Sequence, residues 1–248
     1  MSLLPTVLLA AAGALCTVDS GPQPAVVVEL FTSQGCSSCP PADRWLGTLR
    51  DRHGEGVIPL SMHVSYWDYI GWKDPFARVE FNERQRLLAA SNGSRTVYTP
   101  GVFVQGRELR DWSRSGRFDT ALRAVQQSPS AARLGLAVEA MTERSINVHA
   151  RSEAPRGARL WLALTQSALT TPVRAGENRG ATLRNDHVVR AWHGPHAIGD
   201  ARLSLDVPAD AKLQQGGWAV VALVDDPDGR TLQAVRLPLE RCGATSLR

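Results

Sequence analysis

Two cysteines separated by two residues, Cys36 and Cys39, have the spacing that most directly suggests chemistry. A C-x-x-C pair is either a thiol–disulfide couple or half of a zinc site, and a zinc site draws its other ligands from a second pair or from spaced histidines. The sequence has no second C-x-x-C and no such histidine spacing. We therefore predict a redox couple and no metal site, in which Cys36 is the nucleophile and Cys39 resolves the mixed disulfide.

The residues around this pair predict that it lies at the start of a helix. The apolar run at 25–31 is typical of a buried strand, residues 32–35 form a polar loop, and a helix is expected from about Cys36 to His53. Free amide groups and partial positive charge at a helix N-terminus stabilise a thiolate. This context favours a working couple over an inert structural disulfide, which stays open as the alternative.

A second candidate feature is the dipeptide Thr99–Pro100, which precedes a strand-like run at 102–106. Only proline readily adopts a cis peptide bond. A cis bond beside the cysteines would leave backbone groups free to pair with an extended substrate. We therefore assign Pro100 to the catalytic site and Thr99 to substrate binding.

Four further side chains are candidates for supporting roles. Glu29 lies in the apolar strand before the pair, where burial would raise its pKa and make it a proton acceptor for Cys39; alternatively it sits at an edge or pairs with an arginine. His63 is expected to be a hydrogen-bonded core histidine, with a thiol partner or soft-metal ligand as the alternative. Tyr66 and Trp67 follow the second strand and are predicted to line a substrate groove or to cap the core.

The elements that position these residues alternate up to about residue 127 and then change character. Strands are expected at 25–31, 57–64 and 96–104, and helices at 36–53, 77–90 and 118–127. This order predicts an α/β domain at 25–127 with an inserted loop and helix. After a linker at 127–131, short β runs separated by turn residues predict a C-terminal antiparallel, sandwich-like β domain at 132–242.

The first residues are typical of an export signal. The apolar run Leu3–Leu15 has the length of a signal core, and Ala12 and Ala14 offer a cleavage site. We predict a signal peptide at 1–20 and an exported bacterial protein, periplasmic or secreted, with no stable membrane insertion after signal removal. Cys16 and Cys242 either pair with each other or leave Cys242 as a free thiol.

Charge is spread evenly along the chain. The 248 residues include 28 Lys and Arg and 24 Asp and Glu, with a net charge of +4 and no dense basic run, so nucleic acid is not an expected partner. One polar cluster in the second half either lines an interface with the redox domain, binds a partner, or is a solvated strand pair. It comprises Glu177, Asn178, Arg179, Arg184, His187 and Arg190.

Three segments together resemble the DUF1223 family, bacterial secreted proteins of unknown function with a thioredoxin-like fold. They are ELFTSQGCSSCPPAD at 29–43, HVSYWDYIGWKDPF at 63–76 and VYTP at 97–100. The resemblance is dense over 25–110 and continues thinly through 176–180 and 187–190. It implies a thioredoxin-like domain, with the C-x-x-C as the active pair and Pro100 as its cis-proline. The dipeptide Ser-Ser replaces the Gly-Pro of thioredoxin, and the longer segment up to Pro100 implies an inserted loop and helix.

Three functions are compatible with these residues. The first is an exported thiol–disulfide oxidoreductase that acts on protein or small-molecule thiols and disulfides and needs no cofactor. The second is a non-enzymatic copper or soft-metal protein that uses Cys36, Cys39 and His63. The third is an interaction module in which the cysteine pair is a structural disulfide.

Overall fold

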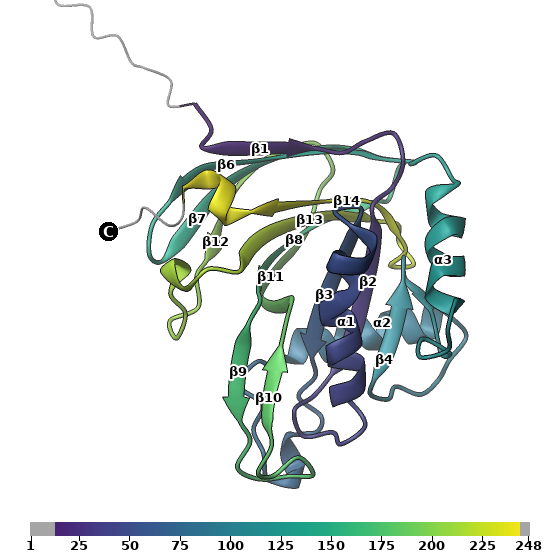
Figure 1. Ribbon diagram of the computed structural model, residues 1–248. Coiled ribbons are helices and arrows are strands. Elements are labelled where there is room, and N and C mark those ends of the chain that lie inside the picture. Colours follow the sequence, from purple (N-terminus) through teal and green to yellow (C-terminus); the bar gives the residue numbers. More distant parts are fainter. Residues whose placement is uncertain (1–12, 244–248) are drawn as a thin grey trace, which may run out of the picture.

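The computed structural model describes residues 13–243 and is dominated by β-sheet (Figure 1). The strands are β1 (Cys16–Asp19), β2 (Val26–Thr32), β3 (Val57–His63), β4 (Gly101–Val104), β5 (Arg107–Glu108), β6 (Arg133–Met141), β7 (Ser145–Glu153), β8 (Arg159–Gln166), β9 (Leu169–Pro172), β10 (Thr182–Asn185), β11 (Val188–His196), β12 (Asp200–Asp206), β13 (Trp218–Asp225) and β14 (Thr231–Pro238). The α-helices are α1 (Pro40–His53), α2 (Val79–Ser91) and α3 (Arg117–Gln126), and the 3-10 turns are η1 (Asp68–Ile70), η2 (Leu213–Gln215) and η3 (Leu239–Cys242). The fold is of the mixed α/β class.

One eight-stranded sheet runs through both halves of the chain, in the order β14-β13-β8-β11-β3-β2-β4-β5. Strands β2 and β3 are parallel, and Thr32 lies opposite His63 at their carboxyl ends. Strand β11 continues the sheet in parallel beside β3, where Val188 lies opposite Ser61. The predicted segments 25–127 and 132–242 therefore share a sheet, although the expected linker does fall between α3 and β6.

A second sheet, in the order β1-β6-β7-β12, packs on the β14–β13–β8 end of the large sheet. The core between them is aliphatic and includes Leu136, Val148, Leu162 and Val220, all buried. These residues come from alternate positions of their strands, because successive side chains of a strand point to opposite faces. The two sheets thus form a sandwich over one end of the molecule.

Helices cover the other end of the large sheet on both faces. Helices α1 and α3 pack on one face, where Val28, Leu46 and Phe118 share a core. Helix α2 packs on the opposite face, where Phe31 and Phe81 belong to a separate core. Successive side chains of β2 alternate between these two cores. The end of the strand is therefore held between two layers of helix. Within residues 13–243, no helix has the length and apolar character needed to cross a membrane.

Several boundaries differ from those expected. The first helix begins at Pro40 and not at Cys36, because two prolines at its first positions need no amide partner and Cys39 is its N-cap. The strand expected from residue 96 begins at Gly101, after Pro100. The apolar pattern does not predict β9, β10 and β11, because polar residues interrupt it, although a solvated strand pair is one interpretation of the polar cluster at 177–190.

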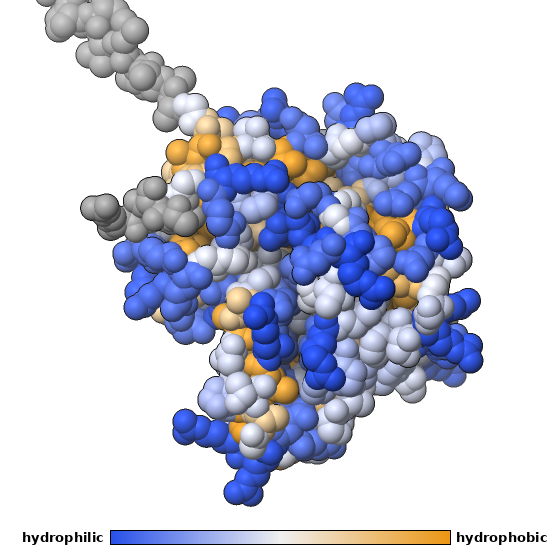
Figure 2. Space-filling model, viewed as in Figure 1, coloured by the Kyte–Doolittle hydropathy of each residue, from blue (hydrophilic) through white to orange (hydrophobic). Residues whose placement is uncertain are grey.

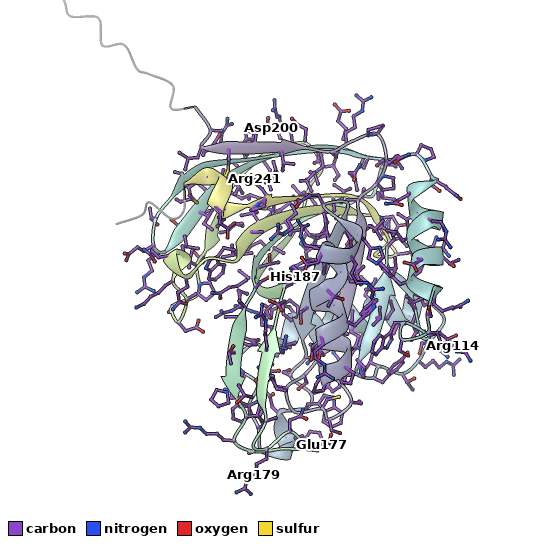
Figure 3. All side chains as sticks on the ribbon, in the orientation of Figure 1. Arg114, Glu177, Arg179, His187, Asp200 and Arg241 are labelled. Carbon is purple, nitrogen blue, oxygen red and sulfur yellow. A yellow bond between two sulfur atoms is a disulfide. The ribbon has the colours of Figure 1, made fainter. Side chains whose placement is uncertain are left out.

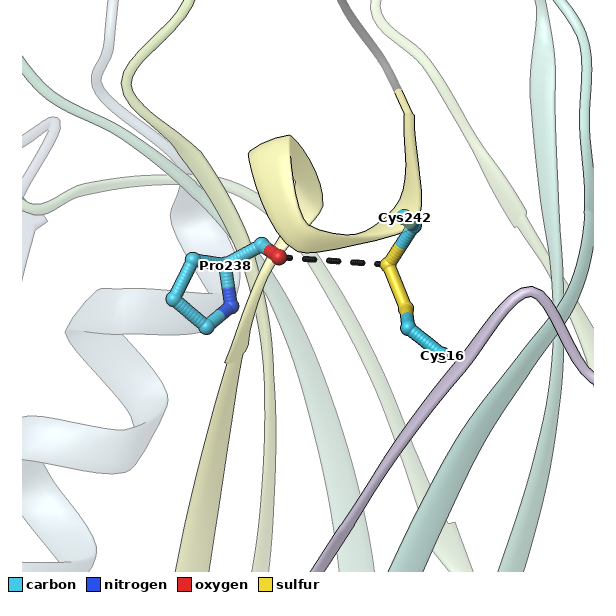
Figure 4. Close-up of a disulfide and its surroundings, with 3 residues drawn as sticks. All are labelled: Cys16, Pro238 and Cys242. Atoms are coloured by element: carbon cyan, nitrogen blue, oxygen red, sulfur yellow. Dashed lines mark hydrogen bonds between the residues drawn. A yellow bond between two sulfur atoms is a disulfide. The ribbon is translucent and has the colours of Figure 1, made fainter.

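A disulfide joins Cys16 to Cys242, with their Cα atoms 5.0 Å apart (Figure 4). It connects β1 to η3, and the carbonyl oxygen of Pro238 lies 3.8 Å from Cys242 Sγ. Of the predicted leader 1–20, residues 1–12 lie outside the described residues. Residues 16–19 form β1, which pairs with β6. A leader ending at residue 20 would include this strand, whereas cleavage after Ala14 would keep it.

Candidate functional site: a dithiol at the start of α1

The loop between β2 and α1 carries both cysteines of the C-x-x-C pair. The Cys36 amide donates to the Ser33 carbonyl at 3.1 Å, and the Cys39 amide donates to the Cys36 carbonyl at 3.2 Å. The pair therefore forms a turn that leads directly into the helix. Because Cys39 is the N-cap, the positive end of the α1 dipole lies at the cysteines.

The two thiols have different acidities. Cys36 is 1% exposed and Cys39 is 0% exposed, and both are free. A hydrogen bond from the Cys39 thiol, aided by Ser38 Oγ at 3.2 Å from Cys36 Sγ, lowers the pKa of Cys36 to about 6. Burial raises the pKa of the Cys39 thiol far above its ordinary value. At neutral pH the reduced pair therefore consists of a Cys36 thiolate beside a Cys39 thiol.

The predicted cis-proline segment lies against the first cysteine. The Thr99 carbonyl oxygen is 3.8 Å from Cys36 Sγ, and the Thr99–Pro100 peptide bond is cis. The structure therefore brings together Cys36, Cys39, Thr99 and Pro100, which the sequence places far apart.

The aromatic residues predicted as substrate-binding hold this segment in place. Trp67 Nε1 donates to Thr99 Oγ1 at 2.7 Å. The Tyr66 hydroxyl donates to Gln85 Oε1 at 3.1 Å, and Gln85 Nε2 donates to the Tyr98 carbonyl at 2.7 Å. Both aromatic side chains are partly buried against the core under α2. Their observed contacts are those of a cap that braces the residues before Pro100.

A buried carboxylate, Asp43, lies one helical turn after Cys39. Residues four apart on a helix are neighbours on one face, and the Asp43 amide donates to the Cys39 carbonyl at 3.1 Å. Burial raises the pKa of Asp43 to about 6. Within the part of the chain described, Asp43 Oδ1 is buried and has no hydrogen-bond partner. Asp43 is thus a carboxyl group near the thiols whose proton affinity suits exchange at neutral pH.

His63 and Asp74 form a buried pair beside this carboxylate. His63 Nδ1 lies 2.7 Å from Asp74 Oδ2, and both side chains are fully buried. Burial opposes the charge on His63, but the Asp74 carboxylate outweighs it and raises the pKa of His63. The nearby Asp43 carboxylate adds to that rise. The imidazole is therefore positioned by Asp74, as expected for a hydrogen-bonded core histidine.

The structure gives no particular support to a metal site. Within residues 13–243, no group of three or more His, Cys, Asp or Glu residues is arranged to hold a metal ion. The Nδ1 atom of His63 is bonded to Asp74, and its buried Nε2 has no hydrogen-bond partner among the described residues.

Glu29, predicted as a proton acceptor for Cys39, lies in a different cluster. Its carboxylate forms an ion pair with Arg84 of α2, and Arg84 also lies 2.9 Å from Asp225 of β13. No contact among those described joins Glu29 to either cysteine. Side-chain alternation is the reason: Glu29 has the parity of Phe31 and faces α2, whereas α1 covers the opposite face. The arginine pairing considered for this residue is the one observed.

Part of the polar cluster in the second half reaches the dithiol loop. Glu177 Oε2 accepts a hydrogen bond from the Ser37 amide at 2.8 Å. Asn178 Nδ2 donates to the carbonyls of Gln34 and Cys36, both at 2.9 Å. Arg179 lies on the same turn between β9 and β10, whereas Arg184 pairs with Asp186 and Arg190 pairs with Asp210.

The family of the chain follows from its match to known proteins. The model of the family described as "Protein of unknown function (DUF1223)" matches residues 27–225. The chain belongs to the DUF1223 family. The matched range of this DUF1223 protein includes the dithiol, Pro100 and the Glu177–Asn178 tip. No curated protein matches the chain.

Two solved structures are similar to this DUF1223 protein. An Agrobacterium tumefaciens protein solved by X-ray crystallography is 24% identical, covers 88% of this chain and 96% of its own, and gives a TM-score of 0.59. That likeness concerns the fold. A domain of the outer membrane lipoprotein Omp28 from Porphyromonas gingivalis is 13% identical, covers 44% of this chain and 95% of its own, and gives a TM-score of 0.28.

Sequence reasoning about this DUF1223 protein missed two site residues, Gln34 and Asp43; Asn178 belonged to a polar cluster for which an interface with the redox domain was one of the alternatives. Asp43 carried a usable signal, since it stands four residues after Cys39 in a segment expected to be helical. Gln34 carried none, because its contact with Asn178 at 2.9 Å joins residues 144 positions apart.

A mainly apolar cleft of about 440 Å³ lies elsewhere on this DUF1223 protein, between α3 and the neighbouring strands. Figure 2 shows hydrophobic groups on that side of the molecule. Its lining includes Leu109, Val125 and Leu232, and it includes neither Cys36 nor Cys39. The cleft is therefore separate from the dithiol.

Proposed function

We propose that this protein is an exported thiol–disulfide oxidoreductase whose working couple is Cys36 and Cys39. The observation that carries the proposal is the asymmetry of the two thiols. A pKa lowered to about 6 makes Cys36 a thiolate at neutral pH, while burial keeps Cys39 protonated. A nucleophilic first thiol followed by a shielded second one is the arrangement that thiol–disulfide exchange requires.

In the first step, the Cys36 thiolate attacks one sulfur of a partner disulfide. A bond forms between Cys36 Sγ and that sulfur, the partner S–S bond breaks, and the other partner sulfur leaves as a thiolate that takes a proton from water. The product is a mixed disulfide between Cys36 and the partner. The site at the positive end of α1 favours the thiolate that starts the step.

In the second step, Cys39 loses its proton and attacks Cys36 Sγ. The Cys36–Cys39 bond forms, the mixed disulfide breaks, and the partner leaves as its second thiol, so the partner is reduced by two electrons and the pair is oxidised. We assign the role of acceptor for the Cys39 proton to the Asp43 carboxylate and not to Glu29. Its support is the position one turn after Cys39 and the pKa of about 6. The reverse sequence oxidises a partner dithiol.

The fold around the pair is compatible with a thioredoxin-like domain, which we include in the proposal. Three features support it: parallel strands β2 and β3 flanking α1, the C-x-x-C before that helix, and the cis Thr99–Pro100 bond against Cys36. Folds host many chemistries, so the assignment of function rests on the thiols and not on this likeness.

Two observations support export. The disulfide between Cys16 and Cys242 is of a kind that persists in oxidising compartments. The apolar run Leu3–Leu15 has the character of a signal core, and cleavage after Ala14 would leave Cys16 in the mature chain. We therefore place the protein in the bacterial periplasm or outside the cell.

The decisive measurement is the reduction potential of the Cys36–Cys39 couple. The purified chain is equilibrated in graded glutathione buffers, the thiols are trapped by alkylation, and each cysteine pair is quantified by peptide mass spectrometry. The Cys16–Cys242 pair serves as an internal structural reference in the same sample. We expect a potential between roughly −270 and −120 mV for the working couple.

A Cys36–Cys39 potential below about −300 mV would identify a structural disulfide. That outcome would contradict the assignment as an oxidoreductase. It would favour the alternative that the protein is an interaction module.

A further inference from the structure

Strands β9 and β10 form an arm that stands apart from both large sheets. They pair only with each other, as a separate two-stranded sheet, in the part of the chain described. Figure 1 shows this arm alongside α1, with its outer end near the start of that helix. The arm tip, residues 176–180, is the turn that connects the two strands; Glu177 and Arg179 lie on it and His187 lies near the base (Figure 3).

The arm tip occupies the hydrogen-bonding groups that flank the nucleophile. Glu177 accepts a hydrogen bond from the Ser37 amide, and Asn178 donates to the carbonyls of Gln34 and Cys36. Ser37 and Ser38 are exposed, whereas the neighbouring Cys36 is 1% exposed. The tip therefore binds the backbone on both sides of a cysteine whose side chain is buried.

The arm can move without opening the three hydrophobic cores, although its Val173 and Asn185 are buried and Asn185 Oδ1 accepts a hydrogen bond from Gln34 Nε2. None of the three hydrophobic cores among the described residues includes a residue of 169–185. Ala168 and His187 flank the arm with φ angles of 62° and 57°, in the left-handed region that residues other than glycine rarely occupy. Such outliers cluster at switch regions, and elements with few core contacts open at low free energy.

We infer that Glu177 and Asn178 determine which disulfides reach Cys36, by standing in for an extended polypeptide substrate. The inference rests on the proposed function and names its substrate class. An extended chain offers both N–H and C=O groups, so it can replace the tip on the Ser37 amide and on the carbonyls of Gln34 and Cys36. A polypeptide disulfide is thus the substrate that displaces the arm.

The test measures how fast Cys36 reacts in the reduced full-length chain. Alkylation by N-ethylmaleimide and by a maleimide-bearing polymer is followed in the wild type, in the Glu177→Ala/Asn178→Ala double variant and in Arg179→Ala. Arg179 is the matched control because its exposed side chain lies on the same tip and is directed away from α1 (Figure 3). Circular dichroism verifies that each variant is folded. Asn178→Asp, which keeps the shape of the side chain but cannot donate to the carbonyls of Gln34 and Cys36, replaces the double variant if that one does not fold.

We expect the double variant to react with the polymer at least about tenfold faster than the wild type, since three hydrogen bonds are removed. The rate with N-ethylmaleimide should increase less than the rate with the polymer. Both rates in Arg179→Ala should equal those of the wild type. A smaller gain with the polymer, or an equal gain in Arg179→Ala, would overturn the inference. The potential of the Cys36–Cys39 couple is measured on the same samples. A catalytic-range potential with unchanged rates rejects the arm alone, whereas a structural-range potential rejects the function and with it the substrate class.

Discussion

The residues around the dithiol give its two thiols different proton affinities. The hydrogen bond from Cys39 stabilises charge on Cys36, and burial opposes charge on Cys39. Asp43 has a carboxyl pKa raised to about 6 by burial, close to that of Cys36. Proton exchange among these groups is therefore possible near neutral pH, where a thiol and a carboxyl group with ordinary pKa values would not exchange.

The alkylation rate of Cys36 in the reduced protein is expected to rise with pH and to level off above a midpoint near 6. The pKa is lowered from 9.0, so the thiolate predominates above about 6 and is lost as the pH falls through that value. By linkage, the Cys36 thiol stabilises the reduced folded state. This contribution increases as the pH rises from about 6 to 9 and is lost as the pH falls through about 6. Stopped-flow alkylation across this pH range checks the prediction, and a midpoint close to 9.0 would contradict it.

Replacing Asp43 with Asn is expected to slow resolution of the mixed disulfide at neutral pH by on the order of 100-fold. The amide cannot accept the Cys39 proton, while attack by Cys36 is retained. Rapid quenching and mass spectrometry should therefore show the Cys36 mixed disulfide accumulating. Asp51→Asn, an exposed change on the same helix, is the control and should behave as the wild type. Resolution at the wild-type rate in the Asp43 variant would assign the proton to another group.

At the scale of elements, α2 connects the two halves of the chain through one side chain. Arg84 pairs with Glu29 of β2 and with Asp225 of β13, and its guanidinium lies 4.9 Å from the ring centroid of Trp192 on β11. These groups come from strands on both sides of β3 in the large sheet. The role of Glu29 is therefore structural, as a partner of Arg84, and not catalytic.

Replacing Arg84 with Met is expected to destabilise the protein by about 3–5 kcal/mol, because it leaves two buried carboxylates without their cation. Burial already raises the pKa of Asp225 to about 6, and loss of the Arg84 cation will raise it further, so the destabilisation should be smaller at mildly acidic pH and greater as the pH rises. Urea unfolding at several pH values measures it. Arg86→Met, an exposed change on the same helix, should stay within about 0.5 kcal/mol of the wild type. Equal effects of the two substitutions would contradict the role of the cluster.

At the scale of the whole molecule, one sheet and one disulfide connect the parts. The eight-stranded sheet passes from β4, beside the dithiol strands, to β14 in the sandwich. The Cys16–Cys242 bond joins residues 226 positions apart and so fastens β1 to the last 3-10 turn. Loss of this bond should therefore affect the unfolding of the entire chain.

Replacing Cys16 and Cys242 with Ser is expected to lower the free energy of unfolding by about 2–5 kcal/mol. The bond closes a loop of nearly the full chain, and a long loop removes much entropy from the unfolded state. Denaturant unfolding of both forms gives the difference. The Cys36–Cys39 couple should keep its potential in this variant, since the disulfide lies in the sandwich and not at the site.

The sequence alone was sufficient for the local features of the site. The spacing of Cys36 and Cys39, the apolar strand before them and the prolines after them are local signals, and each describes a structure that a short segment can adopt by itself. The same holds for Pro100 and for the class of the fold. The DUF1223 motifs at 29–43, 63–76 and 97–100 are likewise contiguous, and the family match contains them.

Only the tertiary structure decided which distant groups meet at the dithiol. Glu29 and Asp43 are both carboxylates within a few residues of the pair, and strand alternation sends the first toward α2 while helical periodicity brings the second beneath Cys39. Asn178 reaches Cys36 across 142 positions because β11 docks beside β3 and carries the arm with it. Such contacts depend on how strands pair across the chain, and no local pattern of residues specifies that pairing.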